Sequence, residues 1–552
     1  MLAIYEFIKK YLKKDTIAAV LAFLLTIGVP ILMAFQEWDD HDRSHRYHTR
    51  DFAYDYLMSC APNAVLFTYG DNDTFPLWYL QEVEGVRTDV RVVNLSLFST
   101  DWYIKQMRRK AYESDPIPMT LSQEKYMEGH RDYVPIYEQN QFLIQEKYEA
   151  NKDLFQSRYD SLYTQLINIL KNSDFPKLNT KDWNFLNSQE GRKNLKILKF
   201  ASFVNALSQD EYIKKFNIDA QKIKNLKQLT DKLIADIADS YAPIDAVIAF
   251  IGSDDPATKI HAQSGDVFDF CPTKKILLPV DSAKVVNNGT VPKKFANKIV
   301  KAVRFTLPKQ YLLKNNLATL DVIASFHWDR PIYFATSMGR DNYLGLTPYF
   351  RLEGFAYRLV PYKAENVPNG MIGSIIADSL YNKLMHVFRY GNIKDPKFNV
   401  SHYVERTVMV MNFRGLFGRT AEALIAEGKL DSAKQVLDKC VEELPNNQIP
   451  FDYFMLPVIN AYYRIGDTTT GDSVAMLTAK NYVEELRYFE QFPTDRIPTL
   501  GNEPLIALQV LQNLNAIAEQ YNRKRLNTYV KSEITKAYTF LMQNRSMMQP
   551  PR

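Results

Sequence analysis

The sequence contains only three cysteines among its 552 residues. Cys60, Cys271 and Cys440 lie far apart, and their spacing matches neither a disulfide framework nor a zinc-ligand pattern. We expect at most one disulfide bond. The stability of the protein must therefore come from the size of its hydrophobic core.

The chain also lacks a large excess of either charge. It has 68 basic and 63 acidic residues, interspersed, and a formal net charge of only +5. A nucleic-acid-binding protein concentrates basic residues on one face, so we expect no nucleic-acid partner. Its 46% hydrophobic and 24% charged residues are typical of globular chains, and its length is too great for a single core. The 34 tyrosines and 32 phenylalanines are typical of large core residues, although tyrosine-rich surfaces also bind sugars or proteins.

Only one uncharged hydrophobic run is long enough to cross a bilayer as a helix, and it extends over residues 16–35. Four lysines precede it, so the positive-inside rule predicts a basic cytoplasmic leader at 1–15 and export of the rest. We expect a single-pass protein of the inner membrane with its bulk on the periplasmic side. A cleaved signal peptide is the alternative, but residues 35–38 offer no small-residue cleavage site.

Residues 64–102 read as a strand, a helix and a second strand. Val65 to Thr68 form a short apolar run that stops at Gly70, and Val90 to Leu95 form another. Between them we expect a helix of about three turns, capped by Asp73, with Pro76 in its first turn and Gly85 at its left-handed exit. Two strands joined in this way usually pair in parallel, which predicts an α/β fold with a Rossmann-like sheet.

Polar side chains follow both strands where parallel sheets bind ligands, at the carboxyl ends. The single glycine and two carboxylates after the first strand do not form a phosphate cradle, which needs several glycines and a lysine. Carboxylates there suit a divalent cation, sugar hydroxyls or backbone N–H groups that need a cap. We predict no cofactor. Binding of a divalent cation by Asp71 and Asp73 is the alternative. The candidate ligand-binding residues are Asp71, Asn72, Asp73, Asn94, Asp101 and Trp102.

Three histidines follow the apolar run. His41, His45 and His48 would share one face if the segment were helical, with Asp42 beside them. Imidazoles suit a transition metal, but nearby arginines disfavour a cation. The alternative is a hydrated helix start next to the membrane.

The run from residue 320 to 339 contains a second polar cluster. We expect a helix to Phe326, a turn holding His327, Asp329 and Arg330, and a strand from Ile332. This turn is a candidate ligand site. The alternative is an ion pair between Asp329 and Arg330 that closes the turn.

The rest of the chain reads as mainly helical. Residues 101–114 predict a helix with a basic patch, which could neutralise a lipid phosphate or be a solvated face. Residues 134–240 predict a helical insertion. Around Phe417 the spacing of small and large residues matches a tetratricopeptide unit, with a looser copy after it. We therefore expect five parts. They are a basic leader at 1–15, a transmembrane helix at 16–35, an α/β domain at 36–133 and 241–365, the insertion at 134–240, and a tetratricopeptide-like domain at 366–552.

The string YGDNDTFPLWYLQEVEGVRTDVRVVNLSL, with WDDHDRS before it, resembles the C-terminal half of a bacterial membrane-protein family once catalogued as a domain of unknown function. That family is related to an animal protein O-mannosyltransferase of the endoplasmic reticulum. The resemblance implies a preceding multi-span, glycosyltransferase-C-like half that carries the chemistry. This chain has one hydrophobic span, so no catalytic residue can be carried over.

Three functional hypotheses follow. The first is an anchored, exported region of an O-mannosyltransferase-like glycosylation protein, with an accessory role in handling acceptor protein or lipid-linked sugar. Its partners would be the lipid bilayer and a multi-span transferase or an acceptor protein. The second is a self-contained metal- or sugar-binding enzyme at the acidic sheet edge. The third is an envelope scaffold that binds proteins through its helical repeats.

Overall fold

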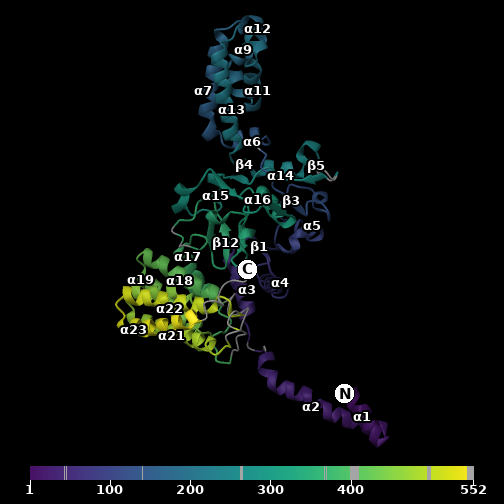
Figure 1. The fold of residues 1–552 in the computed structure, drawn as a ribbon, viewed down its shortest axis with the longest axis vertical. Helices are drawn as coiled ribbons and strands as arrows, with labels where there is room; N and C mark the ends of the chain where they lie inside the picture. Colours follow the sequence, from purple (N-terminus) through teal and green to yellow (C-terminus); the bar gives the residue numbers. More distant parts are fainter. Residues whose placement is uncertain are drawn as a thin grey trace. The chain divides into compact units, whose positions relative to one another are not determined.

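The computed structural model (Figure 1) describes the chain except residues 43, 45, 140, 262–264, 266, 366, 368–369, 398–409, 494–495, 497–498 and 544–552. The described residues divide into two compact units. One unit comprises residues 56–375, and the other comprises residues 1–55 and 376–552. The expected boundary at residue 366 lies outside the described residues.

A five-stranded sheet with the order β11-β12-β10-β1-β2 organises the unit of residues 56–375. The central strand β1 pairs in parallel with both β2 and β10, while the hairpin β11–β12 is antiparallel. The predicted parallel pairing of β1 and β2 is therefore confirmed, with Val65 opposite Arg91 and Thr68 opposite Asn94. All residues of the three parallel strands are buried. The strands are β1 (Val65–Thr68), β2 (Arg91–Asn94), β10 (Ile332–Ala335), β11 (Phe350–Leu352) and β12 (Ala356–Leu359).

Helix α4 joins β1 to β2, as predicted, but it begins earlier than expected. Gly70 occupies the N-cap position, so Asp73 is not the cap, and Pro76 lies inside the helix beyond its first turn. Gly85 has the predicted left-handed conformation. The helix predicted over residues 101–114 ends at Met107 and is followed by a tight turn that pairs Ala111 with Ser114. The helices are α4 (Asp71–Glu82) and α5 (Asp101–Met107), with short 3₁₀ turns η1 (Leu97–Ser99) and η2 (Gln123–Tyr126).

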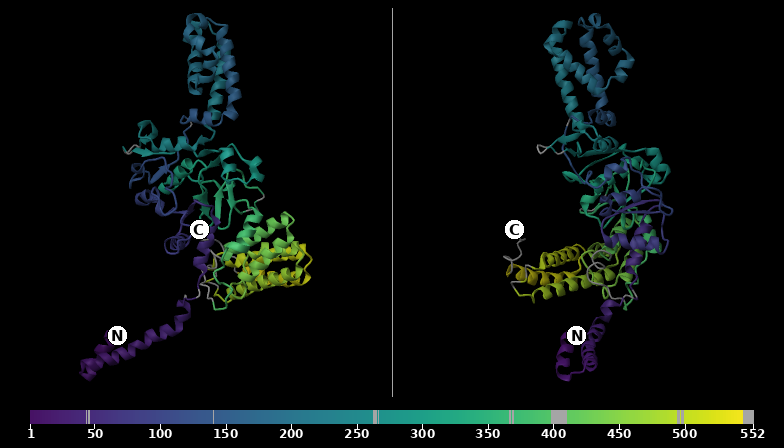
Figure 2. Two further views of the ribbon diagram at one scale, coloured as in Figure 1. Left: turned by 180° about the vertical axis from the view of Figure 1, so that it is seen from behind. Right: turned by 90° about the vertical axis from the view of Figure 1, so that its right-hand side faces the viewer.

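Residues 144–238 form the helical insertion, which has its own hydrophobic core. Amphipathic helices α7 and α13 pack together and bury residues such as Leu166 and Leu233 completely. Both views of Figure 2 show these helices as a separate bundle in blue and teal. They are α6 (Ile144–Ala150), α7 (Lys152–Lys171), α8 (Phe175–Leu178), α9 (Thr180–Leu186), α10 (Gln189–Asn194), α11 (Ile197–Leu207), α12 (Asp210–Phe216) and α13 (Ala220–Ala238).

After the insertion the chain returns to the α/β unit and adds a three-stranded sheet, β4-β7-β8, and two short ladders, β3-β9 and β5-β6. The elements are β3 (Tyr133–Pro135), β4 (Ala242–Pro243), α14 (Ile244–Gly252), η3 (Pro256–Thr258), β5 (Lys259–His261), β6 (Val267–Asp269), β7 (Lys275–Pro279), α15 (Ser282–Asn287), η4 (Lys293–Lys298), β8 (Ala302–Thr306), β9 (Tyr311–Leu313), α16 (Lys314–Ser325), η5 (Arg340–Tyr343) and η6 (Thr347–Tyr349).

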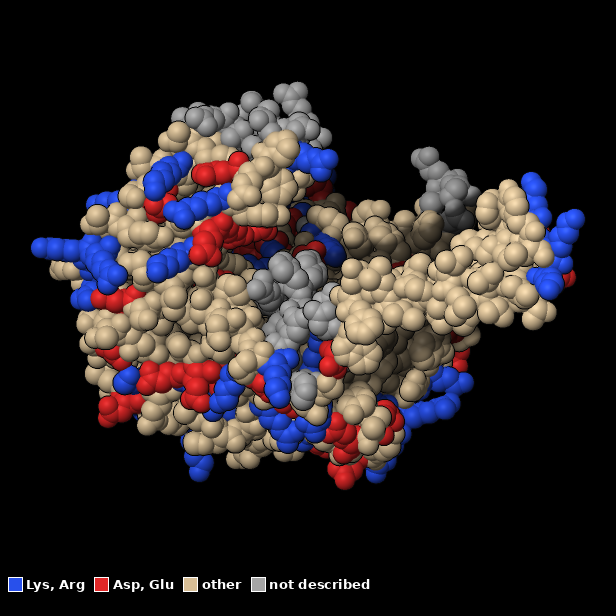
Figure 3. Space-filling view, turned by 90° about the horizontal axis from the view of Figure 1, so that it is seen from below, with Lys and Arg blue, Asp and Glu red and all other residues tan. Residues whose placement is uncertain are grey.

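The N-terminal segment is a short helix, α1 (Leu2–Leu12), followed by the apolar helix α2 (Asp15–His41). Residues 15–38 of α2 are long and apolar enough to cross a membrane, and the helix buries little of its surface in the protein. Figure 3 shows it as an arm without charge over most of its length and with basic side chains at its tip. A core helix of a soluble protein would be covered, so α2 has the character of a membrane anchor or a signal sequence. Helix α3 (His48–Ser59) follows.

Residues 411–543 form three successive helical hairpins, drawn in green to yellow in Figure 2. The predicted hairpin around Phe417 is present, and Phe417, Ala421 and Leu437 are completely buried. Gly428 and Gly466 have positive φ angles in the turns of the first two hairpins. Before the hairpins come α17 (Ala377–Asn382) and a π-helical turn, η7 (Lys383–Val387). The hairpins are α18 (Met411–Ala426) with α19 (Leu430–Glu443), α20 (Met455–Arg464) with α21 (Thr468–Phe489), and α22 (Glu503–Gln520) with α23 (Lys524–Gln543).

Helix α16 is the central helix of the α/β unit, since residues 314–324 are all buried. Its Asp321 carboxylate accepts hydrogen bonds from the backbone N–H groups of Thr120 and Leu121, at 2.8 and 3.1 Å, and from the Tyr126 hydroxyl at 2.9 Å. One buried carboxylate thus holds the loop after α5 against α16.

We predict that Asp321→Asn lowers the free energy of unfolding by about 2 kcal/mol, because an amide cannot accept all the hydrogen bonds that the carboxylate accepts. The thermal unfolding midpoint of the full chain in non-ionic detergent measures this change. Asp329→Asn is the matched control, because Asp329 is largely exposed and pairs only at the surface with Lys284. Equal midpoints for the two variants would contradict the structural role of Asp321.

Candidate functional site: a polar cleft at the carboxyl ends of the parallel strands

A cavity of about 650 Å³ lies where β1 and β2 end. Tyr69 directly follows β1, Ser96 follows β2, and the first residues of α5 and α16 complete the walls. We call this cavity the edge cleft. Its lining consists of Tyr69, Ser96, Ser99, Thr100, Asp101, Trp102, Glu128, Asp132, Leu313, Lys314 and Asn315.

Two aromatic side chains supply the apolar surface of the edge cleft. Trp102 is 53% exposed and Tyr69 is 44% exposed, which is unusual for large apolar rings. The indole of Trp102 is held edge-on to the ring of Tyr103, with 5.5 Å between ring centroids. Fixed, exposed aromatic rings next to polar groups are typical of binding surfaces.

The polar groups of the edge cleft are mostly acceptors. Asp101 supplies a carboxylate from α5, and Glu128 and Asp132 supply two more from the irregular segment after η2. Lys314, the one cation among the described residues of the lining, is almost completely buried, and its Nζ lies 2.5 Å from a carboxylate oxygen of Asp132. It also donates to two backbone carbonyls, so its charge is already satisfied within the protein. The cleft therefore favours ligands that donate hydrogen bonds.

Asn315 joins α16 to the end of β2. Its Nδ2 donates a hydrogen bond to the carbonyl oxygen of Leu95 at 2.9 Å. Its buried Oδ1 has no hydrogen-bond partner within the described part of the chain. A buried acceptor without a partner is costly unless a ligand or water donates to it. Asn315 is therefore the clearest candidate for contact with a bound hydroxyl.

Of the nine predicted ligand residues, Asp101 and Trp102 line the edge cleft, and the other seven do not. Asp71 and Asn72 are exposed at the start of α4. Asn94 is buried, and its side chain donates to the Thr74 hydroxyl at 2.9 Å and accepts from the Leu97 N–H at 3.0 Å. These hydrogen bonds hold α4 and the turn after β2, and Asn94 does not line the edge cleft.

Asp73 is also used within the fold. It is buried at the start of α4, and its carboxylate accepts a hydrogen bond from the Ser337 hydroxyl, which follows β10. Burial raises the pKa of Asp73, although the hydrogen bonds from Ser337 and from nearby backbone N–H groups oppose the rise. This carboxylate links the segments that follow β1 and β10, and it does not line the edge cleft.

The turn with His327, Asp329 and Arg330 lies at the opposite edge of the sheet. It precedes β10, which runs parallel to β1, so it is at the amino ends of the strands. The predicted pair between Asp329 and Arg330 is not formed. Asp329 pairs with Lys284 at 2.6 Å, whereas Arg330 is buried and donates to the carbonyls of residues 63, 115 and 116. Burial lowers the pKa of Arg330 to about 10.

The described residues do not place His41 and His48 on one helix. Helix α2 ends at His41 and α3 begins at His48, with Asp42 in the extended C-cap position between them. His45 lies outside the described residues. No group of three metal-binding side chains is found among the residues that were placed, either here or at Asp71 and Asp73.

Sequence reasoning missed the part of the edge cleft that α16 contributes. Lys314 and Asn315 are more than 200 residues from Tyr69 and Trp102. They read as ordinary polar residues at a helix start, and only the packing of α16 brings them to the end of β2. Glu128 and Asp132 come from an irregular segment with no local signal of function.

We predict that Asp73→Asn becomes more stable relative to wild type as the pH rises through the range between the pKa of unfolded Asp73, near the ordinary value of 3.8, and its raised pKa in the folded protein. A raised pKa means that folded Asp73 holds its proton more tightly than unfolded Asp73. The wild type therefore loses stability as the pH rises from the pKa of unfolded Asp73 toward the raised pKa of folded Asp73. The amide variant does not titrate and does not lose this stability. Thermal midpoints measured across this range, with exposed Asp71→Asn as the control, test the direction.

The chain is thus a mixed α/β protein with an apolar N-terminal helix and a polar, aromatic-lined cleft at the carboxyl ends of its parallel strands. It belongs to the family defined by TMEM260-associated domain 2, whose family model matches residues 49–378, more than half of the chain. Comparisons with curated proteins and with solved structures gave no match. The matched residues include the whole α/β unit and its insertion.

Proposed function

We propose that the protein is a membrane-anchored, exported component of an O-mannosyltransferase-like protein glycosylation system, and that its edge cleft binds the sugar of an acceptor or of a lipid-linked donor. The family match and the sequence resemblance support the glycosylation context. The apolar helix α2, with lysines before it, supports an inner-membrane anchor with the α/β unit on the periplasmic side.

The observation that carries the sugar assignment is the chemistry of the edge cleft. Sugar rings have apolar C–H faces, which pack on exposed aromatic rings such as those of Trp102 and Tyr69. Their hydroxyl groups donate to acceptors such as Asp101 and the unpartnered Oδ1 of Asn315. The cleft volume of about 650 Å³ accommodates a small oligosaccharide.

A second candidate function is catalysis in the same cleft. Asp101, Glu128 and Asp132 all line one cavity, and paired carboxylates can act as general acid and general base on a glycosidic bond. Hydrolysis of a bound oligosaccharide by the purified chain would favour this candidate over binding alone.

The three C-terminal hairpins support a role in protein binding. We propose that they are tetratricopeptide-like and dock an acceptor protein or a transferase subunit, since stacked helical hairpins form extended concave surfaces.

We also propose that the α/β domain is of the Rossmann-like type, because its strands β1, β2 and β10 are parallel.

We predict that the full chain in non-ionic detergent binds α-mannobiose, and that Trp102→Ala weakens this binding about tenfold, or about 1.4 kcal/mol, because the stacking surface is lost. Isothermal titration calorimetry measures the affinity. Asn315→Ala should weaken binding as well, and Tyr79→Ala, which removes an exposed ring outside the edge cleft, should not. If neither α-mannobiose nor the equivalent glucose disaccharides bind to the chain saturably, the sugar assignment is refuted.

We also predict that a multi-span membrane protein copurifies with the chain from gently solubilised membranes, identified by mass spectrometry. A version that ends after residue 375 lacks the helical hairpins and should lose this partner while it keeps sugar binding. Recovery of the same partner without the hairpins would contradict the docking role.

A further inference from the structure

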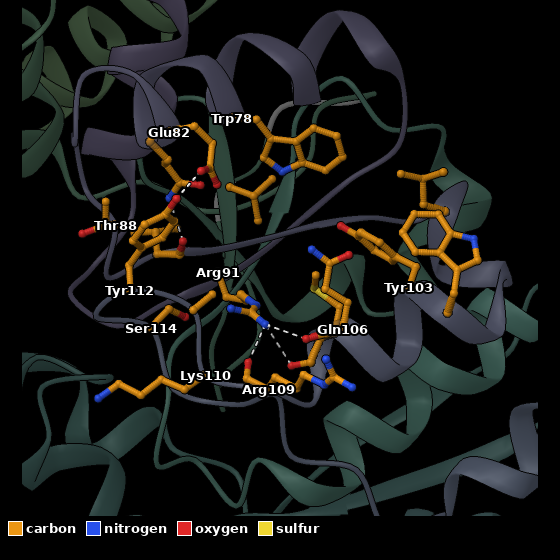
Figure 4. Close-up of a pocket in the computed structure, with 17 residues that line it drawn as sticks. Trp78, Glu82, Thr88, Arg91, Tyr103, Gln106, Arg109, Lys110, Tyr112 and Ser114 are labelled. Carbon is orange, nitrogen blue, oxygen red and sulfur yellow. Dashed lines mark hydrogen bonds between the residues drawn. The ribbon is translucent and has the colours of Figure 1, made fainter.

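A second cavity, of about 490 Å³, lies beside β2, the edge strand of the main sheet (Figure 4). Helix α4 contributes Trp78 and Glu82, and the segment after α5 contributes Arg109 and Lys110. Figure 4 shows Arg91, from β2, in the middle of these side chains. We call this space the arginine cavity.

The Arg91 guanidinium is only partly satisfied by the protein. The side chain is 5% exposed, and its Nη2 donates to the carbonyl oxygens of residues 106, 107 and 109 at 3.1, 3.2 and 2.7 Å. Its Nε and Nη1 are buried and have no hydrogen-bond partner in the described ranges of the chain. A buried cation with unused N–H groups is expensive in free energy unless something compensates it.

No carboxylate compensates Arg91 among the placed residues, and burial lowers its pKa. Other buried arginines differ in this respect, because Arg351 pairs with Glu353 and Arg414 pairs with Asp452. A second buried cation, Arg330, is close enough to Arg91 for the two charges to repel each other. Both arginines donate to backbone carbonyls, but Arg330 also has the carboxylates of Asp115 and Asp89 nearby, so the charge left uncompensated at the cavity is that of Arg91.

The walls of the arginine cavity add to this charge. Arg109 and Lys110 are exposed lining residues, and Glu82, the only carboxylate among the described residues of the lining, already accepts a hydrogen bond from the Tyr112 hydroxyl. The lining thus holds three cationic residues and one engaged carboxylate. Phosphate, with a charge of up to −2 and several acceptor oxygens, complements this set better than a carboxylate does.

We infer that the arginine cavity is a binding site for a phosphate group, which accepts charge-assisted hydrogen bonds from Arg91 and is neutralised by Arg109 and Lys110. The rings of Trp78 and Trp102 border the space for the rest of the ligand. The group can belong to a sugar phosphate or to a lipid headgroup, which share this chemistry. The inference does not rest on the sugar assignment, because inorganic phosphate carries no sugar.

The test measures binding to the full chain in non-ionic detergent at constant ionic strength, with inorganic phosphate, a hexose 1-phosphate and a short-chain phosphatidic acid as probes. Calorimetry gives the affinities, and acetate and chloride are the comparison anions. We expect binding of all three phosphates but not of acetate. Tighter binding of the hexose phosphate identifies a sugar phosphate as the source, and tighter binding of phosphatidic acid identifies a lipid.

Arg91→Gln should weaken phosphate binding at least tenfold. Since a buried substitution can impair folding, the double variant Arg109→Gln/Lys110→Gln gives an independent test, with an expected loss of about threefold. Lys105→Gln is the matched control, because Lys105 is exposed on α5 but lies outside the cavity lining. A phosphate response no larger than that of chloride or acetate, or unchanged affinity in the double variant, overturns the inference.

Discussion

The parallel pairing of β1 with β2 and β10 is the constraint on which the α/β unit depends. Because the three strands run in one direction, everything that follows a strand lies at one edge and everything that precedes it lies at the other. Tyr69 and Ser96 therefore meet at the edge cleft, while Asp329 and Arg330 are excluded from it. The hairpin β11–β12 covers the outer side of β10, which leaves β2, with Arg91 on it, as the other edge strand of the sheet.

Arginines connect segments of this unit that are distant in sequence. Buried Arg330 donates to carbonyls before β1 and in the loop after α5. Half-buried Arg87 donates to carbonyls at the end of α3 and also pairs with Asp89. At Arg330 the acceptors are backbone carbonyls and the Ser114 hydroxyl, so its donors are satisfied without a hydrogen bond to a carboxylate. Backbone carbonyls satisfy the Arg91 guanidinium only in part, because only its Nη2 donates to them. That shortfall separates a structural arginine from one that is suited to hold an anion.

Local patterns predicted the elements well where hydrophobic periodicity was strong. The strands at Val65 and Val90, the helix between them, the helical insertion and the hairpin around Phe417 all occur near their expected bounds. The candidate site was predicted less well. Asp101 and Trp102 line the edge cleft, whereas Asp73 and Asn94 make the hydrogen bonds that close the strand ends. From the sequence alone, a polar residue after a strand reads the same in either role.

Local sequence patterns are enough to specify the apolar helix next to a basic leader, the strand, helix and strand around the acidic turn, and the helical character of most of the remainder. Each of these follows from periodicity and composition within some twenty residues. Which polar groups share a cavity depends instead on packing between distant segments, because Asn315 reaches Leu95 across 220 positions of the chain. Burial likewise decided which charges stay uncompensated, since the environment of Arg91 is made by residues that come together only when α4, α5 and β2 pack.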